Sequence, residues 1–110
     1  YYGGKRYLKE STIKEFTKCQ YCKTDNRRGA GFDKPQLSGP GPACDCVSYA
    51  SFGHTGFTGT IAWADPDEEI IYIFLSNRVY PDAENKKLIY SSVRTLIQEE
   101  IYKSLNTFNP

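Results

Sequence analysis

The segment that most constrains the fold is the apolar run IIYIFLSN at residues 70–77. Ile, Tyr and Phe favour strands, and the run shows no alternation of apolar and polar residues, so we expect a strand buried on both faces of its sheet. The turn sequence DPDE precedes it, and two further strand patterns, 47–54 and 58–64, come before that turn. The three segments together predict a small antiparallel sheet.

A long helix is predicted over residues 81–105, with Asp82 and Glu84 in its first turn, where negative charge suits the helix dipole. Apolar side chains recur at the helical period and predict one buried stripe, made of Ile89, Val93, Leu96, Ile97, Ile101 and Leu105. This helix can cover only one face of the sheet. We therefore expect the other face to be covered by a second copy of the chain or by another part of a larger protein.

The first half of the chain is less regular. A short helix is expected at residues 10–18, where Thr12 and Glu15 have the spacing of an N-terminal capping box. The segment 27–33 is expected to be a strand interrupted by glycines. Residues 34–46 are rich in Pro and Gly, which predicts a loop.

Length and charge exclude several classes of protein. The 110 residues correspond to one domain, and the formal net charge of +1 indicates neither a nucleic-acid surface nor a polybasic membrane patch. No run of about 18 apolar residues is present, so we expect no membrane span. The sequence has no Met at any position, the first included, and we expect it to be a piece of a longer protein.

The four cysteines form two close pairs, Cys19 with Cys22 and Cys44 with Cys46. Two such pairs in loops fit a four-thiolate structural zinc site, and they fit equally two disulfides that join the loops. Free thiols are a third reading. Four cysteines in so short a chain favour an oxidising compartment or a metal site.

The motif SFGHTGFTGT at residues 51–60 contains the only histidine of the chain, between two glycines. Glycines beside a polar residue at the end of a strand allow a close approach of another group to the backbone. The motif is also compatible with a hairpin strand in which the glycines form bulges and the histidine is a polar residue at the sheet edge.

The motif, followed by WADPDEEIIYIFLSNRVYP and an amphipathic helix, resembles the C-terminal part of the serine β-lactamase and penicillin-binding-protein superfamily. The similarity is greatest to the class C and esterase-like branch, and YYGGKRYLKESTIKEF and RRGAGFDKP extend it over nearly the whole chain. The resemblance implies a basic residue–Thr–Gly triplet on a strand that lines an active-site cleft.

The resemblance assigns roles to individual residues of the motif. His54 takes the place of the triplet's basic residue and would orient protons near the nucleophile. Thr55 would hydrogen-bond a substrate carboxylate or carbonyl, and Gly56 would let the substrate lie along the strand. The backbone N–H of Phe57 would be one donor of the oxyanion hole.

The chain departs from the family pattern where acyl transfer requires a serine in S-x-x-K far upstream. The sequence STIK at 11–14 has this form, but its position indicates a chance match and an exposed or capping serine. Val79 and Asp82 stand where class C enzymes tend to carry asparagines that meet the antibiotic's carboxylate, which favours peptidase or esterase-like activity over β-lactam hydrolysis. Arg78 is the expected substrate contact near the cleft. The pair Arg27 and Arg28 is expected to be solvated.

We therefore predict an α+β unit in which a small antiparallel sheet packs on a long C-terminal helix, as part of a β-lactamase-like α/β/α sandwich spanning residues 1–110. Its parent would be a periplasmic or otherwise exported serine hydrolase acting on a cell-wall peptide, a β-lactam or an ester, without a cofactor. The isolated segment would be inactive because it lacks the nucleophile. The alternative is a non-catalytic structural or binding module held by a four-cysteine zinc site or by disulfides.

Overall fold

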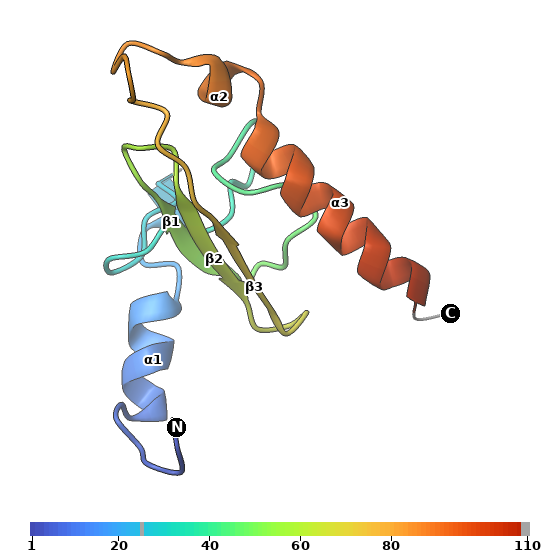
Figure 1. The fold of residues 1–110 in the computed structure, drawn as a ribbon. Coiled ribbons are helices and arrows are strands. Elements are labelled where there is room, and N and C mark those ends of the chain that lie inside the picture. The colour runs from blue at the N-terminus through green and yellow to red at the C-terminus, as the bar shows by residue number, and fades with distance from the viewer. Residues whose placement is uncertain (25, 109–110) are drawn as a thin grey trace.

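The computed structural model describes residues 1–24 and 26–108. Its sheet has three antiparallel strands in the order β1–β2–β3, at Phe52–Thr55, Ile61–Asp65 and Ile70–Phe74. Helix α3, at Val93–Phe108, lies along one face of this sheet (Figure 1). The predicted α+β class, with an antiparallel sheet packed on a C-terminal helix, is confirmed.

The predicted strands differ from the observed ones in their bounds. The strand predicted at 58–64 is Ile61–Asp65, because Gly56 N–H donates to Thr60 O and closes a turn, and the strand predicted at 70–77 ends at Phe74. The first strand begins at Phe52 rather than at residue 47, because the preceding residues form a turn in which Ser51 N–H donates to Ser48 O at 3.1 Å. The predicted strand at 27–33 is wrong. That segment is a turn closed by a Gly29 N–H bond to Phe32 O, and only Asp33 forms an isolated bridge to β1, at Gly53.

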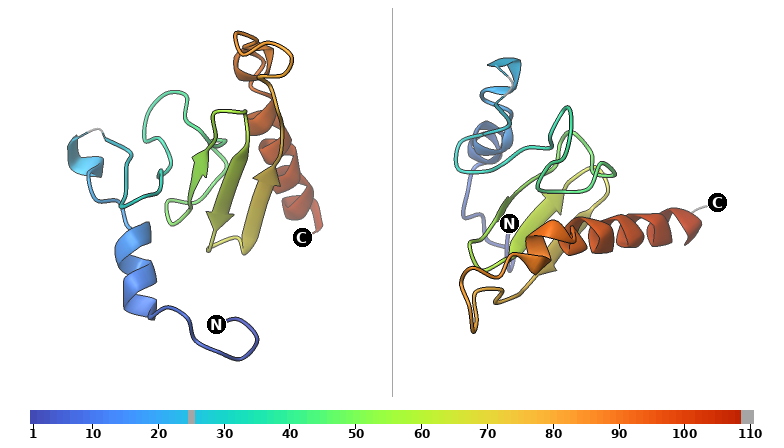
Figure 2. Two further views of the ribbon diagram at one scale, coloured as in Figure 1. Left: turned by 60° about the vertical axis from the view of Figure 1, so that its left-hand side comes forward. Right: turned by 90° about the horizontal axis from the view of Figure 1, so that it is seen from above.

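Helix α1, at Glu10–Thr17, confirms the predicted short helix, and Figure 2 shows it beyond the β1 side of the sheet. The predicted capping box is wrong. Lys9 is the N-cap, and it makes no side-chain capping bond. A single 3-10 turn, η1 at Cys22–Thr24, follows α1.

The predicted helix over 81–105 is two helices, α2 at Lys87–Tyr90 and α3, separated where Ser92 has a φ of 52°. Residues 81–86 are not helical. Asp82 Oδ1 accepts the N–H of Glu84, and the Asn85 side chain accepts the N–H of Lys87 in the same way. Such local side-chain bonds compete with helical hydrogen bonds and favour turns.

The core lies between the sheet and α3. Its buried cluster consists of Ala43, Ile61, Trp63 and Tyr72, with Val47, Phe74 and Ile101 packed against it. The residues that α3 buries most completely are Gln98, at 0% exposure, and Tyr102, at 4%. Of the predicted apolar stripe, Ile101 packs against the core, but the prediction is wrong for Leu96, which is 53% exposed, and for Leu105, which is 45% exposed.

A buried polar network explains why α3 turns this side to the sheet. The carboxylate of Asp65, at the end of β2, accepts bonds from the Ser48 N–H and hydroxyl and from the Tyr102 hydroxyl at 2.8 Å. On the next turn of α3, Gln98 Oε1 accepts the N–H of Cys44 at 3.0 Å. These bonds fix the rotation of α3 by hydrogen-bonding groups that would be costly to bury alone.

The opposite face of the sheet carries His54 and Ala62, which are cross-strand partners, and Ile73 beside them. Ile71 and Ile73 are 75% and 61% exposed. Our prediction that β3 is buried on both faces is therefore wrong for this chain. Within the described residues, this face is covered only at β1, where the ring of Phe52 packs against that of Phe32.

Candidate functional site

The H-T-G motif lies at the end of β1 and continues into the turn that leads to β2. A Cβ atom at Gly53 would overlap Ala62 O and the ring of Trp63, so the first glycine permits close packing of β1 on the core side. A Cβ atom at Gly56 would overlap the hydroxyl oxygen of Thr60. Both glycines that flank the histidine and threonine thus have an intramolecular reason to be glycine.

The side chain of His54 is exposed, on the sheet face opposite α3, and both of its ring nitrogens have partners. Nδ1 lies 2.7 Å from Thr55 O. Nε2 lies 3.1 Å from Nη1 of Arg28, which belongs to the turn before the 34–46 loop. The histidine is therefore held in place from two sides, although it is at the surface.

The contact from Arg28 is itself anchored by Asp33. The Asp33 carboxylate is 1% exposed, and it pairs with Arg27 at 2.6 Å and with Nη1 of Arg28. Two backbone bonds with Gly53, of 2.7 and 3.0 Å, fix Asp33 beside β1. Sequence analysis missed this cluster and expected a solvated arginine pair. A lone acidic residue following two arginines was the available signal.

The turn that carries Phe57 is fixed by three elements. Gly56 N–H donates to Thr60 O at 2.8 Å, which closes the turn. The guanidinium of Arg94, from α3, donates to Gly59 O and Thr60 O. Past β3, the backbone N–H of Arg78 donates to Thr58 O at 2.9 Å. The backbone on either side of Phe57 is therefore held, while the Phe57 N–H has no hydrogen-bond acceptor within the described residues.

Arg78, the predicted substrate contact, lies at the same turn. Its guanidinium carbon is 4.9 Å from the centre of the Phe57 ring, a cation–π distance. Its Nη1 also donates to Ala83 O and Asn85 O, so these carbonyls orient the side chain. A hollow of about 410 Å³ beside it is lined in part by Ser76 and Leu88.

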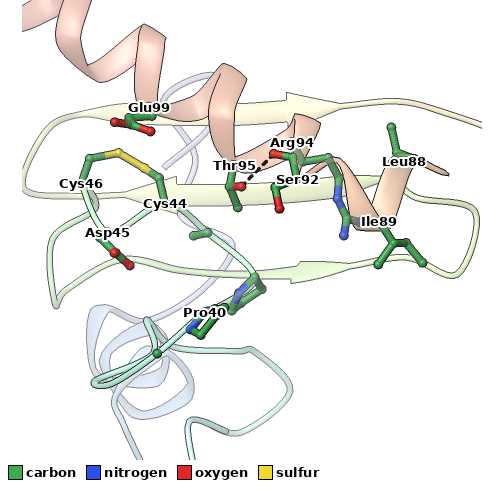
Figure 3. A pocket seen from close by; sticks show the side chains of 14 residues that line it. Pro40, Cys44, Asp45, Cys46, Leu88, Ile89, Ser92, Arg94, Thr95 and Glu99 are labelled. Carbon is green, nitrogen blue, oxygen red and sulfur yellow. Dashed lines mark hydrogen bonds between the residues drawn. A yellow bond between two sulfur atoms is a disulfide. The ribbon is translucent and has the colours of Figure 1, made fainter. Parts of the chain in front are cut away.

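A hollow of about 670 Å³ lies away from the H-T-G motif, between the Pro/Gly loop and helices α2 and α3 (Figure 3). Pro40, Cys44, Arg94 and Glu99 are among the residues that line it. Since α3 forms one wall, this hollow is on the opposite side of the sheet from His54. Its size therefore does not mark it as the site that the motif predicts.

The cysteines form two disulfides, Cys19–Cys22 and Cys44–Cys46. The bridges lie within each pair, so the prediction that disulfides join the two loops is wrong. Over residues 1–24 and 26–108, no group of three or more His, Cys, Asp or Glu side chains is arranged to hold a metal ion, which removes the four-thiolate cluster. No described helix is long and apolar enough to cross a membrane.

The sequence STIK lies on α1, far along the chain from the motif. Ser11 is exposed, and the Nζ of Lys14 pairs with Glu10 at 2.6 Å. The lysine that would activate the serine in an S-x-x-K nucleophile is thus engaged by a carboxylate.

The family model described as Beta-lactamase matches residues 15–104. No curated protein and no solved structure matches the chain. The match begins within α1 and ends within α3, so it contains the three strands, the motif and the turn that carries Phe57.

Proposed function

The chain belongs to the β-lactamase family, and on this premise we propose that it is the C-terminal portion of a serine hydrolase of the class C and esterase-like branch. In this proposal the chain supplies the H-T-G strand and one donor of the oxyanion hole. The nucleophilic serine belongs to a part of the protein outside these 110 residues. The substrate is a cell-wall peptide, a β-lactam or an ester.

The observation that carries the proposal is the Phe57 backbone N–H. It has no acceptor within the described residues, and the turn around it is fixed through Gly56, Thr58 and Gly59. A donor that is already in place when charge develops on an acyl oxygen needs no reorganisation, and one such donor typically contributes roughly 3–4 kcal/mol to lowering the barrier. Phe57 is therefore the best-supported functional residue of the motif.

The other motif residues take supporting roles. The Thr55 hydroxyl, at the end of β1, would bind a substrate carboxylate or carbonyl, and Gly56 would leave the adjacent backbone open to the substrate. Arg78 is placed to bind an anionic substrate group, since its guanidinium lies against the Phe57 ring. His54 would orient the proton-transfer groups that the missing part of the protein provides.

The cysteines support the proposed location. Two disulfides are typical of proteins from oxidising compartments. We place the protein in the periplasm or another extracytoplasmic location. The exposed sheet face around Ile71 and Ile73 would be covered by the missing part of the same domain or by a second copy.

The proposal is tested by intact-mass analysis after treatment with a fluorophosphonate and, separately, with benzylpenicillin. We expect no adduct on the folded 110-residue chain and one adduct on the full-length gene product. An adduct on the 110-residue chain that disappears in Ser11→Ala would place the nucleophile at STIK and overturn the proposal. Full-length protein that is folded and unlabelled by both probes would also overturn it, in favour of a non-catalytic module held by its disulfides.

A further inference from the structure

We infer that the positive charge at the basic position of the triplet is carried by Arg28, with Asp33 as its anchor, and that His54 beside it is a neutral imidazole. This inference deepens the proposed function and rests on it for its catalytic meaning. The arrangement itself is intramolecular and can be measured without any substrate.

The hydrogen-bond partners of His54 define its protonation state. Thr55 O is a carbonyl, which can only accept, so Nδ1 at 2.7 Å must carry a proton and donate it. A guanidinium can only donate, so Nε2 at 3.1 Å from Arg28 Nη1 must be unprotonated and accept. A ring that donates from Nδ1 and accepts at Nε2 is the neutral Nδ1–H tautomer.

The cluster of Arg27, Arg28 and Asp33 carries one surplus positive charge. One carboxylate faces two guanidinium groups, those of Arg27 and Arg28, so the cluster carries a net charge of about +1. The Arg28 side chain is 50% exposed and that of Arg27 is 28% exposed. The surplus charge is therefore presented to solvent mainly by Arg28, which is the arginine in contact with His54.

Asp33 is a positioning residue in this arrangement. Its carboxylate is buried, and its backbone is paired with Gly53, the residue before His54. Because the bridge pairs Asp33 with Gly53, the Asp33 side chain, and with it Arg28, lies beside the strand that carries His54. Arg28 Nη1 forms an ion pair with the Asp33 carboxylate and lies 3.1 Å from the imidazole, so a single nitrogen lies between the two groups.

The consequence for the site is a division of roles between two residues. With its Nε2 lone pair engaged by Arg28, His54 cannot accept a proton there unless Arg28 moves away. The imidazole supports and orients the guanidinium, and a substrate group with negative charge meets Arg28. A permanently charged arginine thereby supplies the electrostatic attraction that a lysine at the same position of the triplet would supply.

The test is ¹⁵N NMR of the histidine ring in the 110-residue chain, at about pH 7.5. His54 is the only histidine, so its two ring nitrogens need no assignment by mutation. We expect Nδ1 to have the chemical shift of a protonated nitrogen and Nε2 that of an unprotonated one. A ring protonated at Nε2 alone, or at both nitrogens, would overturn the inference, and this outcome does not depend on any variant.

A matched pair of variants then separates the two arginines. Arg28→Ala should release Nε2, and both ring nitrogens should move toward shifts averaged between the tautomers. Arg27→Ala also removes a partner of Asp33 and one charge, but it should leave the wild-type ring shifts unchanged. Identical ring spectra for the two variants, with backbone spectra showing both folded, would mean that Arg28 does not hold the histidine and would overturn the inference.

These outcomes are independent of those for the proposed function. Failure of the serine probes would refute the hydrolase without changing the histidine spectrum. A wrong tautomer would refute the division of roles while leaving probe labelling of the full-length protein intact.

Discussion

The two faces of the sheet differ in a way opposite to simple expectation. The face toward α3 buries a polar network of Asp65, Ser48 and Tyr102 next to Trp63. The other face exposes Ile71 and Ile73 to solvent around His54. The carboxylate of Asp65 is thus inside, where hydrogen bonds satisfy it, although Trp63 Nε1 and Gln98 Nε2 are buried there without a partner. Ile71 and Ile73 are outside, where nothing among the described residues covers them.

The difference indicates which face is complete. Burying a carboxylate is costly unless its partners are present, and on the α3 side the partners of Asp65 belong to this chain. Adjacent apolar side chains on a sheet are typical of an interaction surface. The α3 face is therefore covered within this chain, whereas the His54 face has the exposed apolar character of an interaction surface.

The largest expected effect on the free energy of unfolding is on the face toward α3. Trp63→Ala should lower the free energy of unfolding by about 3–5 kcal/mol, because it removes a large side chain that is 1% exposed and leaves a cavity. The measurement is urea denaturation followed by far-UV circular dichroism, since Trp63 is the only tryptophan. The control, Ile73→Ala on the open face, should cost less than about 0.5 kcal/mol. Similar losses for the two variants would contradict the comparison.

The polar network should have a smaller effect that depends on pH. Burial acts to raise the pKa of Asp65, but hydrogen bonds from Ser48, Tyr102 and the Glu68 backbone outweigh it, and the pKa in the folded state is lowered. A lowered pKa stabilises the fold fully above the unfolded-chain value of about 3.9, and this stability is lost as the pH falls through the lower folded value. Asp65→Asn should therefore cost about 1–3 kcal/mol at pH 7 and less in acid.

The measurement for Asp65→Asn is the free energy of unfolding in urea at about pH 7 and at about pH 2.5, for wild type and variant. The other carboxylates are common to both proteins, so the difference between them isolates Asp65. A deficit of equal size at both pH values would show that the charge of Asp65 does not contribute. Tyr102 reports the same contact from the other side, since burial and the Asp65 carboxylate raise the pKa of its hydroxyl well above the ordinary value.

Substitutions on the exposed face around Ile71 and Ile73 should change self-association rather than the free energy of unfolding. If a second copy covers it, wild-type protein should sediment faster as its concentration rises, and Ile71→Lys with Ile73→Lys should remain monomeric. The control places two lysines on the exposed side of α3, as Leu96→Lys with Leu105→Lys, and should associate like wild type. Monomeric wild-type protein at every concentration would exclude a second copy as the cover of this face.

The strands were predictable because their signal is local. Runs of β-branched and aromatic residues, the turn before Ile70 and the glycines around His54 together place the motif at a strand end. The same local reasoning gave α1 within one residue of its observed end. The start of the first strand was not predictable, because the turn at Ser48–Ser51 depends on hydrogen bonds that the sequence pattern does not show.

The rotation of the C-terminal helix was not predictable from hydrophobic periodicity. The pattern favours the side with Leu96 and Ile97, but Gln98 and Tyr102 have partners at Cys44 and Asp65, far away in the sequence. The Asp33–Arg28–His54 cluster was missed for the same reason. It requires the bridge between Asp33 and Gly53, a tertiary contact of a segment that was predicted to be a strand interrupted by glycines.

The central claim is that the Phe57 backbone N–H stabilises an oxyanion, and a comparison of two substitutions isolates that group. Phe57→Pro in the full-length gene product eliminates the N–H, whereas Phe57→Ala keeps it and removes the ring that stacks on Arg78. With a p-nitrophenyl ester as substrate and circular dichroism to establish folding, the proline variant should lose about 10²–10³-fold in kcat and the alanine variant only a few-fold. Equal kcat values for two folded variants would contradict the account.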